Sequence, residues 1–475
     1  MNLIVIVLDT LRYDMVHHLG VDWIKTPCMD KLAQESVIFD NCYGEGEPTV
    51  PVRRALMTGM RSFPWRYDFD ITGLWPSGRG WHKIPSEQPT MAEILLQEGY
   101  TTGIIGDTYH IFKPTMNFTR GFAGFDWVRG QESDNWKTGP LSAIDLSKYS
   151  KPDADPRQVR LLVQYLLNNK DRKTEEDYTG AQVFVRGAQW LEDNCENTPF
   201  MLWLECFDPH EPWDPPTEYA DAYCPNYDGI ELIHGHMNDN LTDKERERIK
   251  ALYAGEVTFV DKYVGVLLDK AESLGLLDDT VVMLISDHGC ELFDHGGLHK
   301  SASGMHPYNT QLVWFIRHPD GKLQDHRVAG LVQNQDLFPT ALALLGVGHE
   351  EVDGENVWSL ATGESDGVRD HVITGWGSFA SVRDEEWNYI VDFETADATP
   401  VLYHHQSDPK EDTDVAADHP DVIEKQRKRL EALLEQELPA VLPDKTYPAE
   451  GPFITRYDNL IKSGRIDPPK PKADE

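Results

Sequence analysis

The chain has 475 residues, of which 40% are hydrophobic, and a formal net charge of −36 at pH 7. This length and hydrophobic content are enough for a large core and for two or three domains. Nucleic acids and anionic membrane surfaces bind basic proteins, so the negative charge argues against both as partners. An anionic substrate would therefore need a local cluster of arginine, lysine or metal to hold it.

The cysteines and the N-terminal residues indicate the cellular compartment of the protein. The six cysteines form no C-x-x-C motif, and we interpret them as free thiols of a reducing compartment. The apolar run at residues 3–8 is too short for a signal peptide and has no basic flank, and no other apolar run is long enough to span a bilayer. We therefore expect a cytoplasmic protein without a membrane partner, and the sequence leaves open whether it forms a homo-oligomer.

Three continuous apolar runs predict strands that are buried on both faces of a mostly parallel sheet. They lie at residues 3–8, 200–207 and 280–286. The first run leads into Asp9 and Thr10, the second into Asp208, and the third into Asp287 and His288. Ligands of open α/β sheets bind at the carboxyl ends of the strands, so we expect the functional site at this edge.

The remaining predicted helices and strands indicate an α/β fold class. We predict helices at residues 26–33, 89–95, 159–167, 244–274, 336–342 and 422–438, and further strands at residues 37–39, 99–106, 312–316, 381–383 and 387–390. Residues 130–177 are mostly polar and irregular, which indicates an insertion at the mouth of the site, where specificity usually resides. We predict a catalytic domain over residues 1–364 and a smaller α+β subdomain with an extended tail over residues 365–475.

Residues 48–59 have the pattern of a nucleophile at the start of a helix. Thr49 stands just before the first turn, Pro51 suits an early helical position, and Arg53 follows one turn later on the same side. An alcohol, a bidentate cation and a helix N-terminus that meet at one point suit attack on a tetrahedral oxyanion ester. The alternative is a surface helix that Thr49 caps, with Arg53 in solvent.

The same segment resembles the sulfatase signature C/S-x-P-S-R-x-x-L-x-T-G of the alkaline phosphatase superfamily. Five positions match in register, namely Pro51, Arg53, Leu56, Thr58 and Gly59. Thr49 stands where sulfatases carry the Cys or Ser that is oxidised to formylglycine, and Val52 stands for Ser. Further motifs in the same order extend the resemblance over most of residues 1–440.

The resemblance implies an alkaline-phosphatase-like fold, with a mostly parallel central sheet flanked by helices. It also implies one divalent metal ion, Mn²⁺, Zn²⁺, Ca²⁺ or Mg²⁺, at the positions that match the family's ligands. These positions are Asp9, Thr49, Asp287 and His288, with Thr10 as a further candidate. Oxygen donors with one imidazole suit such ions, and a metal beside Thr49 would lower the pKa of its hydroxyl.

Substrate contacts are expected around this metal. The candidates are Arg53, His110, His210 and Lys300. Lys300 would hold a non-bridging oxygen or assist the leaving group, and His210 would donate a proton to the leaving oxygen as a general acid. Asp107, in contrast, occupies the position of a lysine that sulfatases commonly carry.

Spare ligand types lie near these residues. His299, His306 and Asp208 are interpreted as polar loop residues. A second metal site is the alternative for them if the fold brings them together.

The resemblance implies a metal-dependent hydrolase of a small anionic ester, with Thr49 as the direct nucleophile. The substrate is a phosphate or phosphonate (di)ester, or a sulfate ester. A formylglycine hydrate expels sulfate through its second hydroxyl, and a threonine ester lacks that route, so Thr49 favours phosphoryl chemistry. The alternatives are a phosphoryl-group transferase and a catalytically impaired sulfatase-like protein that binds an anion. Asp107 supports the last of these, whereas Asp9, Arg53 and Lys300 oppose it.

Overall fold

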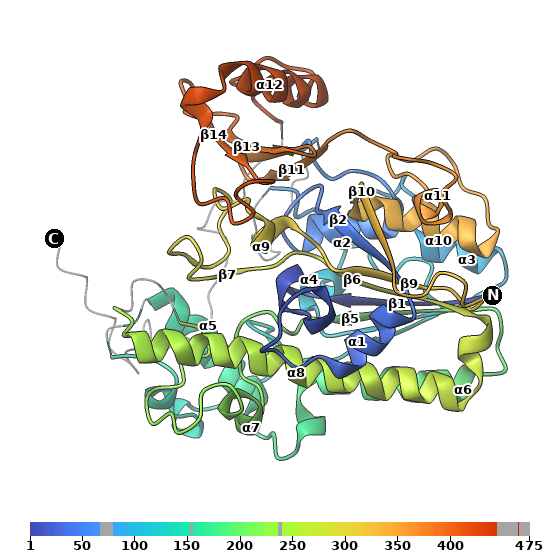
Figure 1. The fold of residues 1–475 in the computed structure, drawn as a ribbon. Helices are drawn as coiled ribbons and strands as arrows, with labels where there is room; N and C mark the ends of the chain where they lie inside the picture. The colour runs from blue at the N-terminus through green and yellow to red at the C-terminus, as the bar shows by residue number, and fades with distance from the viewer. Residues whose placement is uncertain (67–78, 153, 155, 236–239, 444–463, 465–475) are drawn as a thin grey trace.

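The computed structural model describes residues 1–66, 79–152, 154, 156–235, 240–443 and 464 (Figure 1). A central eight-stranded sheet carries helices on both faces, and a smaller antiparallel sheet with one helix lies above it. This arrangement confirms the predicted α/β class with a mostly parallel central sheet.

The central sheet has the strand order β10-β2-β9-β6-β1-β5-β3-β4, and β9 is its antiparallel member. Its strands are β1 (Asn2–Leu8), β2 (Val37–Tyr43), β3 (Thr101–Gly106), β4 (Gly124–Trp127), β5 (Phe200–Cys206), β6 (Thr280–Ser286), β9 (Trp314–Arg317) and β10 (His326–Gln333). Alternate side chains of β1 enter two separate cores: Ile4, Ile6 and Leu8 pack into one, and Leu3, Val5 and Val7 into the other. The unbroken apolar run of β1 is the consequence of this double burial.

Two layers of helices cover the sheet (Figure 1). One face carries α1 (Pro27–Gln34), α5 (Pro156–Asn169), α6 (Thr179–Asn194), α7 (Thr217–Asp221) and α8 (Asp243–Ser273). The other carries α2 (Val50–Thr58), α3 (Met91–Gln97), α10 (Leu337–Leu345) and α11 (Trp358–Thr362). Two short helices, α4 (Tyr109–Phe112) and α9 (Pro307–Thr310), and the hairpin of β7 (Glu291–Leu292) and β8 (Leu298–His299) lie in the loops that follow β3 and β6.

The smaller sheet supports the loop that precedes α2. It contains β11 (Val372–Trp376), β12 (Phe379–Arg383), β13 (Trp387–Asp392) and β14 (Val401–His404), and α12 (Pro420–Leu434) packs on it. The Glu47 N–H donates to the Gly375 carbonyl (2.8 Å), and the Gly375 N–H donates to the Glu45 carbonyl (3.0 Å). These bonds join the sheet to the loop before Thr49, whereas the subdomain boundary near residue 365 remains a prediction.

One helix ends earlier than the sequence pattern indicates. The structure ends α12 at Leu434 rather than at residue 438, because Glu435 adopts a left-handed backbone conformation with φ of 56°. A left-handed residue of this kind closes a helix C-terminus.

Two expectations from composition can be compared with the structure. All six cysteines are free thiols. Within the part of the chain that the structure describes, no helix combines the length and the apolar character needed to cross a bilayer.

A tyrosine from α8 holds the turn that follows β1. The Tyr253 hydroxyl donates to the Thr10 carbonyl (2.9 Å) and accepts from the Arg12 N–H (3.0 Å). Thr10 itself has a positive φ of 63°, which is unusual for a threonine. The long helix α8 thus fixes the strained turn that presents Asp9 and Thr10.

We predict that Tyr253→Phe lowers the free energy of unfolding by about 1–3 kcal/mol, because it leaves two buried backbone groups without partners. Urea denaturation of the purified protein measures this effect. Tyr389→Phe is the matched control, since Tyr389 is equally buried and no hydrogen bond of its hydroxyl is found among the described residues. An equal loss of stability in both variants would contradict the proposed role of Tyr253.

Candidate active site

Side chains from four adjacent parallel strands meet at the carboxyl edge of the central sheet. Asp287 follows β6, Asp9 follows β1, Glu205 lies near the end of β5, and Asp107 follows β3. Strand β2 runs in the same direction and leads into the loop that carries Thr49. The order of the strands therefore gathers residues that are far apart in the sequence.

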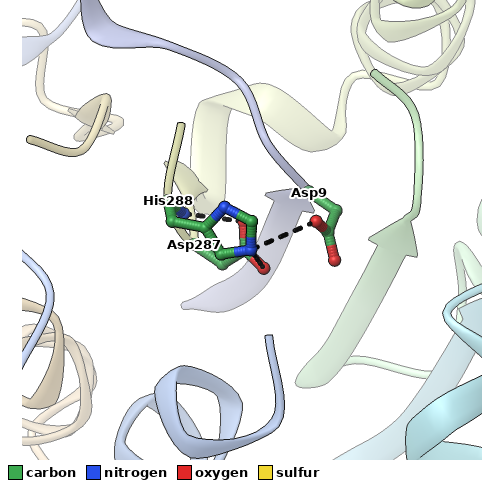
Figure 2. Close-up of side chains that lie close together, drawn as sticks. All are labelled: Asp9, Asp287 and His288. Carbon is green, nitrogen blue, oxygen red and sulfur yellow. Dashed lines mark hydrogen bonds and ion pairs between the residues drawn. The ribbon is translucent and has the colours of Figure 1, made fainter. Parts of the chain in front are cut away.

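Asp9, Asp287 and His288 form a buried group whose donor atoms lie within 4.8 Å of one another. Figure 2 shows the imidazole facing the two carboxylates, with Nε2 of His288 3.6 Å from Oδ1 of Asp9 and 3.5 Å from Oδ2 of Asp287. Nδ1 of His288 donates to the Gly289 carbonyl (2.9 Å), and burial lowers the pKa of His288 to about 4. The neutral ring therefore directs its Nε2 lone pair at the carboxylates, an arrangement that fits a divalent cation between them.

Thr49 stands at the N-terminus of α2 but does not cap it. Its side chain makes no capping hydrogen bond, and its φ of 38° is strained for a β-branched residue. Its hydroxyl oxygen lies 3.4 Å from Nε2 of His288. The capped-helix alternative is therefore wrong, and the Thr49 hydroxyl lies beside the candidate metal ligands.

Arg53 is fully buried rather than in solvent. Its Nε donates to Glu205 (2.7 Å), its Nη1 to Asp287 (2.6 Å), and its Nη2 lies 3.1 Å from Asp9. Burial opposes the charge, but the three carboxylates raise the pKa of Arg53 above its ordinary value. The guanidinium thus orients the acidic residues of the site, whereas its expected contact with substrate remains a prediction.

Thr10 lies behind the ligand group. Its hydroxyl donates to Oδ1 of Asp9 (2.8 Å), its N–H donates to Oδ1 of Asp287 (2.9 Å), and its carbonyl accepts from Tyr253. All three polar groups of Thr10 therefore have partners. These bonds orient the two aspartates, and the expected role of Thr10 as a further metal ligand remains a prediction.

Lys300 and His210 both bind Glu211, the first at its carboxylate and the second at its backbone carbonyl. Nζ of Lys300 donates to both oxygens of Glu211 (2.9 and 2.7 Å), and Nδ1 of His210 donates to the Glu211 carbonyl. Burial lowers the pKa of His210 to about 3, so the ring is neutral and its Nε2 carries a lone pair. Lys300 is a protonated group beside it, and the expected general-acid role of His210 remains a prediction.

His110 packs among aromatic rings and reaches a residue of the 130–177 insertion. Its ring centroid lies 4.0 Å from that of Tyr109 and 4.7 Å from that of Trp81. Its Nε2 lies 3.6 Å from Oε2 of Glu132, and burial holds the pKa of His110 well below its usual value. The insertion therefore contributes Glu132 to this region, as its expected position at the site mouth indicates.

The Asp107 carboxyl group binds other residues of the protein. It accepts from the Phe207 N–H (2.7 Å) and from the side chain of Gln131 (3.0 Å), which also donates to Asp208 (2.6 Å). Burial, together with the nearby Asp208, raises the pKa of Asp107 to about 7. Asp107 thus joins β3, β5 and the insertion, so the replacement of a lysine here is not by itself a sign of lost catalysis.

The structure does not gather the spare ligand types. His306 binds Glu411 (2.8 Å), His299 lies 3.4 Å from Glu211, and Asp208 binds Gln131. Across residues 1–66, 79–152, 156–235 and 240–443, Asp9, Asp287 and His288 are the group with metal-ligand spacing. The alternative of a second metal site is therefore not supported.

The sequence does not predict two buried acidic residues of the site, Glu205 and Glu47. Glu205 interrupts a strand predicted to be buried on both faces, and a charge in such a strand is itself a signal of a buried partner. Glu47 lies two residues before Thr49 and is fully buried. Burial raises the pKa of Glu47 well above its usual value, and the charges of Asp287, Glu45 and Asp9 raise it further.

Comparison with known proteins relates the chain to one group. A sequence model described as Sulfatase matches residues 1–347. The chain is 24% identical over 431 residues to the ulvan-active sulfatase of Formosa agariphila, covering 86% of this chain and 75% of that protein. It is 24% identical over 423 residues to an arylsulfatase of Clostridium perfringens, with coverage of 82% and 83%. Its fold is similar to that of the phosphonate monoester hydrolase of Agrobacterium radiobacter, with a TM-score of 0.71, 21% identity and coverage of 95% and 99%.

We predict that Asp287→Asn lowers metal occupancy and ester hydrolysis together, because it removes one of the two ligand carboxylates. The affinity for the cation should fall by at least about tenfold. Metal content per protein after dialysis, and activity of the same preparation, measure the effect. Asp294→Asn removes the same charge at a residue that binds Arg12, and it should leave both values unchanged. Full occupancy with full activity in Asp287→Asn would exclude the site.

We predict that Asp107→Asn becomes more stable, relative to the wild type, as the pH rises from 5 to 8. The folded protein holds a proton on Asp107 more tightly than the unfolded chain does, since the pKa is raised from 3.8 to about 7. Wild-type stability is therefore lost as the pH rises through this range. The variant lacks this loss, so the difference in unfolding free energy should shift in its favour by about 1–3 kcal/mol.

Urea denaturation at both pH values measures this shift. Asp126→Asn, at a half-exposed residue of β4, is the control and should show no comparable change. A difference between Asp107→Asn and wild type that is independent of pH would contradict the buried, proton-binding state of Asp107.

Proposed function

Because the chain belongs to the sulfatase family of ester hydrolases, we propose that it hydrolyses phosphodiesters or phosphonate monoesters in preference to sulfate esters. The observation that carries this proposal is the position of Thr49 at the carboxyl edge of the sheet. Its backbone is strained, and its hydroxyl makes no capping bond but lies beside His288. The similarity of the fold to that of a phosphonate monoester hydrolase is compatible with it.

Asp9, Asp287 and His288, with the Thr49 hydroxyl, are the residues that would hold the family's divalent metal. Their oxygen donors and single imidazole suit Mn²⁺, Zn²⁺, Ca²⁺ or Mg²⁺. A cation bound there supplies positive charge that lowers the pKa of the hydroxyl and stabilises the anionic ester. Arg53 holds the carboxylates in place from the opposite side.

The reaction proceeds in two displacements at phosphorus. The Thr49 hydroxyl releases its proton to solvent, its oxygen attacks, a Thr49–phosphorus bond forms, and the bond to the ester alcohol breaks. Lys300 is the protonated group that can give its proton to the leaving oxygen, since His110 and His210 are neutral. Water then attacks phosphorus, the bond to Thr49 breaks, and the hydroxyl is restored.

Sulfate is the poorer substrate for this arrangement. A formylglycine hydrate releases sulfate by breaking its own carbon–oxygen bond, with its second hydroxyl as the driving group. Threonine has one hydroxyl and a methyl group on Cβ, so it has no such route. A sulfo-threonine would have to be hydrolysed at sulfur, which makes turnover of sulfate esters slow.

We predict that Thr49→Ala abolishes hydrolysis of a model phosphodiester or phosphonate ester, with a loss in kcat of at least about 10³-fold, because it removes the hydroxyl that attacks phosphorus. Thr58→Ala is the matched control, since Thr58 lies at the other end of α2 and donates to the Arg54 carbonyl (2.7 Å). It should retain the activity.

Three further experiments separate phosphoryl from sulfuryl chemistry. Mass spectrometry of the peptide around Thr49 should show an unmodified threonine. A panel of aryl sulfate, phosphate monoester, phosphodiester and phosphonate ester, run on metal-verified protein, should show faster release of phosphorus products. Faster sulfate release would overturn the preference. A gain of sulfatase activity in Thr49→Cys, made in a host that forms formylglycine, would show that the remaining site accepts sulfate.

A further inference from the structure

Glu47 is a fully buried acid whose side chain has no visible partner. Neither of its carboxylate oxygens makes a hydrogen bond to any described residue. Its backbone is fixed by the hydrogen bond to Gly375, and its Oε1 would lie 2.2 Å from a Cβ at Gly44, so the carboxylate packs directly against the Gly44 backbone. The position of this carboxylate is therefore set by the fold.

The charges around Glu47 do not balance. The buried site contains five carboxylates, one of which is Glu47, and two cations oppose them. The acids are Asp9, Glu47, Glu205, Glu211 and Asp287, and the cations are Arg53 and Lys300. Arg53 and Lys300 already bind the other four acids. A buried carboxylate without a hydrogen bond or a counter-charge is costly, and a cation bound in the site would remove this cost.

The surroundings of Glu47 indicate where a bound cation would lie. Glu47 lies two residues before Thr49, whose hydroxyl is 3.4 Å from Nε2 of His288 in the candidate metal group. The charges of Asp287 and Asp9, the two carboxylates of that group, also act on the pKa of Glu47. The candidate metal group has two carboxylates of its own, so the charge of a third carboxylate close behind them would add to the attraction for a divalent cation.

We propose that Glu47 is the third carboxylate of the metal site. Its oxygens stand outside the group of donor atoms that lie within 4.8 Å of one another. Glu47 therefore acts on the cation from the second layer, through its charge and through cation-bound water, rather than as one of the inner ligands. This assignment rests on the metal site of the proposed function, and it implies that the site selects oxygen-seeking cations such as Mn²⁺, Mg²⁺ and Ca²⁺.

Calorimetric titration of chelator-treated protein with MnCl₂ and with CaCl₂ tests the proposal. Glu47→Gln keeps the shape of the side chain and removes its charge. We expect it to bind each cation about 10–100-fold more weakly, the range found when groups behind metal ligands are removed. The melting temperature of the metal-free variant should match that of the wild type, and the rise in melting temperature on adding metal should be smaller.

Glu45→Gln is the matched control. It removes the same charge two residues earlier, but the Glu45 carboxylate accepts the N–H groups of Ser62 (2.8 Å) and Phe63 (3.0 Å). We expect it to bind metal as the wild type does, with lower stability of the metal-free protein. Glu47→Asp, which keeps the charge, should bind metal more tightly than Glu47→Gln.

The outcomes separate this inference from the proposed function. Wild-type metal affinity in a folded Glu47→Gln variant would overturn the role of Glu47 while leaving the site of Asp9, Asp287 and His288 in place. Equal weakening in Glu45→Gln and Glu47→Gln would also overturn it, since the effect would then be one of general charge. Absence of metal binding by the wild type would refute the metal site itself.

Discussion

The buried guanidinium of Arg53 is the interaction on which the site depends. It lies between Asp9, Glu205 and Asp287, which come from three neighbouring strands of the central sheet. Three carboxylates at the end of adjacent strands would repel one another in a medium of low dielectric constant, and each would be costly to bury alone. A single arginine from the first turns of α2 binds all three and, by the same contacts, fixes the helix that presents Thr49.

Thr49 is held from several directions. The loop before Thr49 continues β2 and pairs with Gly375 of β11, and Arg53 binds the Thr49 carbonyl from within α2 (3.1 Å). The smaller sheet is therefore part of the active-site framework, although its residues lie more than 300 positions along the chain. A hydroxyl that must attack within a few tenths of an ångström needs such support, and the strained backbone of Thr49 is maintained by it.

The sequence predicts the buried strands and the polar residues at their ends, because a continuous apolar run and the group that follows it are local signals. Asp9, Asp287 and His288 could be assigned in this way. The partners of Arg53 could not, since Glu205 is 152 residues away and its pairing depends on the strand order. The protonation state of His210 and the burial of Glu47 likewise arise from tertiary contacts, which no spacing or periodicity encodes. The insertion could be placed near the site, but its contribution of Glu132 could not.

The three departures from the sulfatase motifs have different consequences for the reaction. Val52 stands in place of a serine, and its side chain packs in the core between α2 and the sheet, so it affects the helix rather than the reaction. Asp107 stands in place of a lysine and binds Gln131 and the Phe207 N–H, so its carboxyl group connects parts of the fold. Thr49 alone changes an atom that would contact the substrate. The chemistry of this protein therefore turns on what a secondary alcohol can do where its relatives in the signature carry an aldehyde hydrate, and that argument favours displacement at phosphorus.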